Sequence, residues 1–272
     1  MRFPVMLFAA AALLAAGPSR VAAAESPASG SPYGWLVTVN AKAVVAPSWI
    51  GSSDYGFIAY PTVSFRRPGE PASWSSPDDS AGFAAFSRNG FSAGPVVAFR
   101  EGRYDKGNAI LRGVHNVGWT LEPGVFVSLW LLEETLRARI ELRRGFRSED
   151  GVVATLGLDY VTRAGDFTFA IGPRLNFADA RSMRSRFGVT ALDAARAPAY
   201  APHDPGAGVA SAGFRGSASW RLSSDWALTA HGGWQRLTGG AASSPIVKIA
   251  GARDQFIAGL IASYTFRTGE WP

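Results

Sequence analysis

Residues 136–143 read LRARIELR, and this stretch decides the fold class. Apolar and charged side chains alternate strictly along it. At helical spacing the apolar residues would spread around the cylinder, whereas a period of two places them all on one face. The stretch is therefore predicted to be a β-strand. Its apolar face carries Leu136, Ala138, Ile140 and Leu142, and its charged face carries Arg137, Arg139, Glu141 and Arg143.

The same alternation recurs in segments of about ten residues that are bounded by Gly, Pro, Asp, Ser and Asn. It is clear at 35–43, 167–177 and 256–266, and weakest at 82–88. The other predicted strands lie at 57–66, 91–100, 119–131, 152–162, 208–222 and 225–237. A bacterial outer-membrane barrel has an even number of strands. The count is therefore ten without 82–88, or twelve if 106–113 is a further strand.

Two signals favour a membrane barrel over a secreted soluble β-sandwich, whose strands would alternate equally well. Short connections at 131–134, 163–166 and 223–225 alternate with long ones at 178–207 and 238–253, as periplasmic turns and outer loops do. Aromatic residues flank the short turns, as expected of interfacial rings: Trp130, Tyr160, Phe167, Trp220 and Trp226. The predicted fold is all-β, a closed antiparallel transmembrane β-barrel of 10 or 12 strands.

Composition excludes several other classes. The chain has 272 residues, of which 47% are hydrophobic and 18% charged, with no Cys. A soluble domain has about a quarter of charged residues, so this chain is charge-poor, and it is too apolar to be disordered. Without cysteine it has no disulfide framework, no iron–sulfur cluster and no cysteine nucleophile.

Residues 1–24 are predicted to be a secretory signal peptide. Arg2 precedes an apolar run at 5–16, and the small residues 22–24 supply a cleavage site near Ala24. The run is too short for a membrane anchor. Residues 25–272 would then form the barrel in the outer membrane of a Gram-negative cell, in contact with its lipid. A secreted destination also argues against a nucleic-acid partner.

No enzyme motif is found. The chain lacks the G-x-S-x-G and H-E-x-x-H patterns, and its three histidines lie far apart. His231 is interpreted as a polar lumen residue rather than a catalytic base. The acidic pairs 78–79 and 149–150 are interpreted as turn formers rather than ion sites. We therefore expect no enzymatic activity, no catalytic or metal site and no cofactor.

Arginines supply the candidate binding residues. Arg137, Arg139 and Arg143 are predicted to line the barrel interior, where Glu141 can pair with them. Arg144, near the outer rim, could bind lipid phosphates through its planar guanidinium, and so could a loop cluster. An ordinary solvated or charge-balanced position is the alternative for each. The loop cluster consists of Arg181, Arg184 and Arg186.

Six motifs are spread over almost the whole chain beyond the signal peptide. The most extensive is a long-loop pattern that includes Asp179, Phe187, Gly188, Val189 and Tyr200. The others are PSWIGSSDY at 47–55, NGF at 89–91, GP at 94–95, Ser244-Pro245 and the aromatic YTF at 264–266. In this order, the six motifs resemble the signature of the MipA/OmpV family of outer-membrane proteins.

The resemblance implies an outer-membrane barrel. In the eponymous members it implies a scaffold that links a lytic murein transglycosylase to a penicillin-binding murein synthase. A narrow solute channel or an adhesin is the alternative function, since other members are linked to adhesion and solute passage. The chain departs from the family pattern in three places: Trp49, the longer Pro-rich stretch 67–82, and the residues 267–272 that follow Phe266.

Murein partners would be periplasmic. The short turns expose few residues on that side, so the stretch 67–82 is predicted to be the docking surface, with Trp74 as its aromatic anchor. The alternative is a turn without a function.

Overall fold

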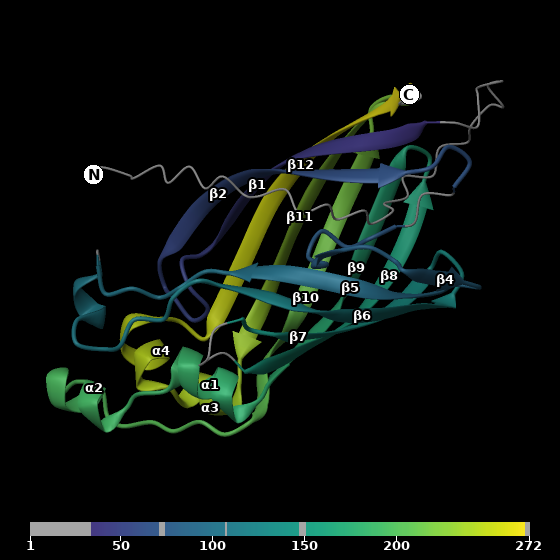
Figure 1. The fold of residues 1–272 in the computed structure, drawn as a ribbon. Coiled ribbons are helices and arrows are strands. Elements are labelled where there is room, and N and C mark those ends of the chain that lie inside the picture. The colour runs from purple at the N-terminus through teal and green to yellow at the C-terminus, as the bar shows by residue number, and fades with distance from the viewer. Residues whose placement is uncertain (1–33, 71–73, 107, 147–150, 270–272) are drawn as a thin grey trace.

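The computed structural model describes residues 34–70, 74–106, 108–146 and 151–269. The predicted signal peptide 1–24 and the acidic pair 149–150 lie outside these residues. The described chain forms one antiparallel sheet of twelve strands (Figure 1). Its order is β2-β1-β12-β11-β10-β9-β8-β7-β6-β5-β3, and β4 also pairs with β5.

Ten of these strands are long, and they coincide with the alternating segments of the sequence. Their bounds are β1 (Trp35–Pro47), β2 (Tyr55–Arg66), β5 (Phe91–Arg100), β6 (Thr120–Leu132), β7 (Leu136–Arg144), β8 (Val152–Ala164), β9 (Phe167–Ala178), β10 (Gly208–Arg221), β11 (Trp226–Leu237) and β12 (Asp254–Thr268). The weak segment contains only the short strands β3 (Ala81–Gly82) and β4 (Phe86–Arg88). Within 106–113, the alternative position for a twelfth strand, the chain forms the short 3-10 helix η1 (Ala109–Leu111).

The all-β prediction is confirmed, but closure of the barrel is not. Among the described residues, no strand pairing joins β2 to β3, β4 or β5. The sheet therefore curls into a half-barrel with β2 at one edge (Figure 1). Pro61 lies in the edge strand β2, consistent with the preference of proline for sheet edges, where a missing N–H costs least.

The two faces of the sheet differ as the alternation predicts. Along β7, the side chains of Ile140 and Leu142 are about half exposed on the outer face. Arg137 and Glu141, on the inner face, are 3% and 4% exposed. The outer face of the sheet is therefore apolar, and the charged side chains point into the curl.

The two ends of the half-barrel also differ. At the turn end, adjacent strands are joined by the short turns 133–135, 165–166 and 222–225. Aromatic side chains are exposed there, and Trp226 packs on Tyr264 with ring centroids 4.8 Å apart. Trp130 does not join them, because its side chain faces inward and packs against Trp74.

The long connections form a compact cap at the opposite, loop end (Figure 1). We call it the loop cap. It contains η1 and four short helices that the strand alternation did not predict. None of the helices in the described chain has the length and apolar character needed to cross a membrane. The four helices are α1 (Ala180–Phe187), α2 (Ala191–Arg196), α3 (Gly239–Ser243) and α4 (Pro245–Ala250).

Candidate functional site

The chain between β2 and β3 enters the curl of the sheet. Residues 74–80, which we call the inner segment, contact side chains on the inner face of β7, β8 and β9. The hydroxyl of Ser80 donates to the Glu141 carboxylate at 2.5 Å, and its backbone N–H donates to the same group at 3.1 Å. The inner segment is thus tied to the wall by polar contacts rather than by strand pairing.

Asp79 of the inner segment is held by Arg137 of β7. Two nearly parallel hydrogen bonds, of 2.7 and 3.0 Å, join the guanidinium to the two carboxylate oxygens. Arg137 also donates to Asp159 of β8 at 2.7 and 3.2 Å. This two-pronged geometry is the strongest form of arginine–carboxylate contact. Arg137 therefore bridges the wall and the inner segment.

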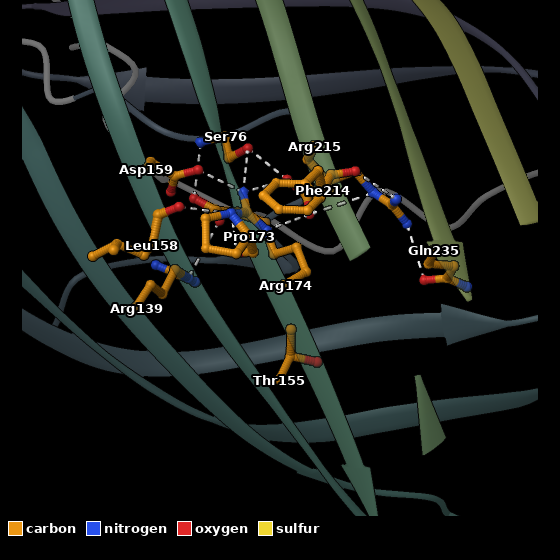
Figure 2. Close-up of polar contacts among 12 residues, drawn as sticks. Ser76, Arg139, Thr155, Leu158, Asp159, Pro173, Arg174, Phe214, Arg215 and Gln235 are labelled. Carbon is orange, nitrogen blue, oxygen red and sulfur yellow. Dashed lines mark hydrogen bonds and ion pairs between the residues drawn. The ribbon is translucent and has the colours of Figure 1, made fainter. Parts of the chain in front are cut away.

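Arg174 of β9 is the centre of the cluster (Figure 2). It donates to both oxygens of Asp78, at 2.9 and 3.0 Å, and to Asp159 at 2.6 Å. The same guanidinium donates to the hydroxyl of Ser76 at 3.1 Å. Burial alone would raise the pKa of Asp78. The hydrogen bonds and charge of Arg174, with smaller contributions from Ser76 and Arg215, outweigh it and lower this pKa to about 2.

The pairing of β8 with β9 is interrupted next to Arg174. Two residue pairs, Leu158 with Pro173 and Asp159 with Gly172, are missing from the ladder, whereas the register is the same on either side; proline has no N–H to donate. Arg174 donates to the carbonyl of Leu158 at 3.3 Å and to that of Pro173 at 3.1 Å. A side chain at Gly172 would lie 1.6 Å from the Leu158 carbonyl oxygen, so the close approach of the two strands requires glycine there.

Of the remaining arginines, Arg139 donates to Glu141 at 2.9 Å, whereas Arg143 and Arg215 are incompletely paired. Arg143 donates to Ser80 and Thr155, at 2.8 and 2.9 Å. Arg215 of β10 donates to Gln235 at 3.2 Å, and its Nε lies 3.8 Å from Asp78. The Nε atoms of both Arg143 and Arg215 are buried without a hydrogen-bond partner. Buried polar atoms are normally satisfied, so two unpaired donors in one place need an explanation.

These side chains surround a cavity of about 160 Å³. Five arginines and four carboxylates line it, with a rim of neutral polar groups. The arrangement can bind oxyanions through planar guanidinium groups. Within the described part of the chain, no three His, Cys, Asp or Glu side chains gather as a metal site would require. The charged lining residues are Asp78, Asp79, Arg137, Arg139, Glu141, Arg143, Asp159, Arg174 and Arg215.

The structure corrects the predicted role of Trp74. Its side chain is 8% exposed and packs against Val161 and Ala170, so it is not an exposed docking anchor. The Trp130 ring lies 6.3 Å away, and the Arg137 guanidinium lies 4.6 Å from the Trp74 ring centroid. Apolar packing and the cation over the ring face both stabilise the Trp74 indole in this buried position.

The acidic pair 78–79 lies in a turn, as predicted: the Asp79 N–H donates to the Ser76 carbonyl at 3.0 Å. Both carboxylates also form ion pairs with the inner arginines, which the sequence analysis did not predict. One signal in the sequence could have revealed this. The inner face of the strand at 136–143 carries three arginines and one acid, so it needs carboxylates from elsewhere in the chain.

The other predicted arginines lie outside this cavity, and binding of lipid phosphates by them stays a prediction. Arg144 is exposed on the outer face at the end of β7. The loop cluster is divided, because Arg184 pairs with Asp204 whereas Arg186 lies 2.6 Å from Glu122 of β6. Arg181 is exposed.

The structure gathers the motif residues of the long loop in the loop cap. Asp179 caps α1 by accepting from the Ser182 N–H at 2.7 Å, and the buried hydroxyl of Ser244 donates to the Phe187 carbonyl at 2.7 Å. Pro245 begins α4, where its missing N–H costs nothing. Gly188 ends α1, and Phe187, Val189 and Tyr200 are 1%, 3% and 2% exposed. These positions hold the cap together.

Asp193 fastens the cap to the neighbouring loop. It forms a capping box with Thr190, and it accepts from His115 at 2.8 Å through Nδ1 and at 2.9 Å through the backbone N–H. Burial alone would raise the pKa of Asp193. The hydrogen bonds from Thr190 and His115 outweigh burial and lower the pKa to about 2.

The family described as "MltA-interacting protein MipA" matches residues 39–266. The chain belongs to this family. No curated protein sequence matches it.

Solved structures resemble this MipA-family chain only distantly. The COG4313 outer membrane channel from Pseudomonas putida F1 is 10% identical, with a TM-score of 0.41, over 87% of this chain and 97% of that one. The CymD monoaromatic hydrocarbon channel is 8% identical, with a TM-score of 0.37, over 88% and 90%. Neisserial surface protein A is 10% identical, with a TM-score of 0.26, over 88% and 100%. Likenesses this weak carry no argument about function.

Proposed function

We propose that this MipA-family chain is a non-enzymatic outer-membrane barrel that acts as a scaffold for murein enzymes. The family match over residues 39–266 carries this proposal, because the family is described by its interaction with MltA. The partners would be a lytic murein transglycosylase and a penicillin-binding murein synthase. Export would follow cleavage of the signal peptide near Ala24, and the barrel would contact outer-membrane lipid.

The two faces of the sheet support a place in a membrane. The outer face exposes large apolar side chains along the long strands, which lipid would cover. Aromatic side chains at the turn end would lie at headgroup depth. Because short turns are periplasmic in outer-membrane barrels, the turn end would face the murein.

The interior supports a scaffold rather than a wide pore. The inner segment crosses the curl, and its carboxylates pair with arginines of the wall. A lumen filled by mutually paired side chains is typical of small barrels, whereas wide aqueous channels need about 16 strands. The narrow-channel alternative would require this network to open.

The beginning of the predicted docking stretch, at 67–70, is largely exposed at the turn end. There the Arg67 N–H donates to the Glu70 carboxylate at 3.0 Å, and the Arg67 guanidinium stacks 4.1 Å from the centroid of the exposed Trp35 ring. The turn end therefore has an ordered surface that carries an aromatic ring, a positive charge and a negative charge. We propose that this surface, rather than Trp74, contacts the periplasmic partners.

The test is capture of purified murein transglycosylase and synthase by the folded protein in detergent. Replacing Trp35 and Arg67 by Ala should reduce capture at least about tenfold if they form a binding hot spot. The matched control replaces Arg184 and Asp204, an exposed pair at the loop end, and should leave capture unchanged. Failure of the unaltered protein to capture either enzyme would reject the scaffold function.

A further inference from the structure

The inner arginines are arranged to receive two oxyanion groups at once. Arg137 of β7 and Arg174 of β9 each bind a separate carboxylate of the inner segment through two nitrogens. Both arginines project from long strands of the wall, so their positions do not depend on the inner segment. Asp79 and Asp78 therefore show where a bidentate oxyanion binds and in what orientation.

We propose that this cavity is a binding site for small oxyanionic solutes, either one solute with two oxyanion groups or a single-group oxyanion at each arginine, and that Asp78 and Asp79 occupy it from within the chain. Such a solute would replace the two carboxylates and release the inner segment from the wall. Dicarboxylates and phosphates share the required chemistry, because both present planar or near-planar pairs of oxygens to a guanidinium.

Unused donors in the cavity favour an external ligand. The Nε atoms of Arg143 and Arg215 are buried without a hydrogen-bond partner, and both arginines line the cavity. Their nearest carboxylate oxygens, on Glu141 and Asp78, lie 3.6 and 3.8 Å away, beyond hydrogen-bond distance. The inner segment thus leaves part of the donor set unsatisfied. The cavity of about 160 Å³ exceeds the roughly 30 Å³ that one water molecule occupies. An oxyanion with its remaining water can therefore enter beside the segment before replacing it.

The charge balance makes replacement selective for anions. Without Asp78 and Asp79, the lining would keep five arginines against only Glu141 and Asp159. Buried cations without counter-charges are costly, so the wall must regain negative charge when the segment leaves. A neutral or cationic solute cannot supply it.

The inner segment is suited to leave because no strand pairing holds it. Its contacts to the wall include the side chains of Trp74, Ser76, Asp78, Asp79 and Ser80, together with the Ser80 N–H. Asp159, which binds the same two arginines, is instead part of β8 and stays in place. A solute would therefore replace the carboxylates of the inner segment, whereas Asp159 would stay bound to the two arginines.

The first experiment compares binding by calorimetry in an uncharged maltoside detergent. Succinate and inorganic phosphate are titrated into the wild type and into Asp78→Asn/Asp79→Asn, with folding verified by heat-modifiable migration. Because the double variant lacks the two competing carboxylates, it should bind at least one probe about tenfold or more tightly than the wild type does. The probe whose affinity increases more identifies the class of solute. The control Asp166→Asn/Asp225→Asn, at exposed turns, should bind as the wild type does. Equal or weaker binding by the folded double variant would overturn the proposal.

A second measurement does not depend on the charge variant folding. The chain has no cysteine, so Ser75→Cys introduces a single thiol next to the buried part of the inner segment. Succinate or phosphate should accelerate alkylation of this thiol several-fold more than sodium chloride of equal ionic strength. Equal acceleration by all three salts would show general screening and would overturn release by a bound oxyanion.

Discussion

Arg137 and Asp79 are separated by 58 residues, yet their side chains meet in two hydrogen bonds of 2.7 and 3.0 Å inside the curl of the sheet. Arg137 is 3% exposed and also binds Asp159. The pair therefore joins a strand of the wall to a segment that is not itself part of the sheet.

Removing Arg137 should destabilise the folded protein markedly. Arg137→Gln leaves Asp79 without its two-pronged partner and Asp159 with fewer donors, and breaking a buried ion pair from one side costs about 3–5 kcal/mol. Urea unfolding followed by tryptophan fluorescence would measure the loss. The matched control is Arg236→Gln, whose pair with Asp254 at 2.8 Å is exposed and should matter by less than about 1 kcal/mol. Similar losses in both variants would refute this assignment of energy.

The strands could be predicted from the sequence, but the inner segment could not. Alternation along 136–143 depends only on neighbouring residues, since a sheet with one apolar face imposes a period of two. The contact between Asp79 and Arg137 depends instead on which parts of the wall face each other after curling, and residues 74–80 carry no period. The same limit explains why the sequence predicts Trp74 as a docking anchor rather than as a buried residue of this segment.

The helices of the loop cap were missed for a different reason. They have five to eight residues, too few to establish a helical period. Their ends nevertheless carry signals: Thr190 with Asp193 forms a capping box, and Ser244-Pro245 is a typical helix start. Reading these caps would have predicted two of the four helices.

A charge on the outer face should be far more harmful than a change of size. Ile140 is 51% exposed on the outer, apolar face of β7, so Ile140→Arg should cost about 2–4 kcal/mol if this face contacts lipid near the bilayer midplane. Ile140→Val is the control and should be nearly neutral. Refolding into lipid vesicles over a denaturant series would compare them. Equal stability of the two variants would contradict the membrane position of this face.

The close approach of β8 and β9 should make Gly172 intolerant of any side chain. In Gly172→Ala the new Cβ would lie 1.6 Å from the Leu158 carbonyl oxygen, so the strands must separate and Arg174 must lose its contact with that carbonyl. Overpacking of this kind costs about 1–3 kcal/mol. Gly216→Ala on β10, where the nearest atom is at an ordinary 3.5 Å, should be tolerated. Heat-modifiable migration and thermal unfolding would measure both, and equal effects would reject the clash.

The loop cap should lose stability in strong acid because of Asp193. Its pKa in the folded protein is about 2, below the ordinary value of 3.8, so the folded state favours the charged carboxylate. This contribution, about 2 kcal/mol, is complete above pH 3.8 and is lost as the pH falls towards 2. Asp193→Asn lacks this titration, so wild type and variant should differ at pH 7 and converge near pH 2 in urea titrations. Asp204→Asn, at an exposed loop pair, should follow the wild type throughout. A wild-type advantage over Asp193→Asn that is undiminished at pH 2 would show that the carboxylate does not stabilise the cap through its charge.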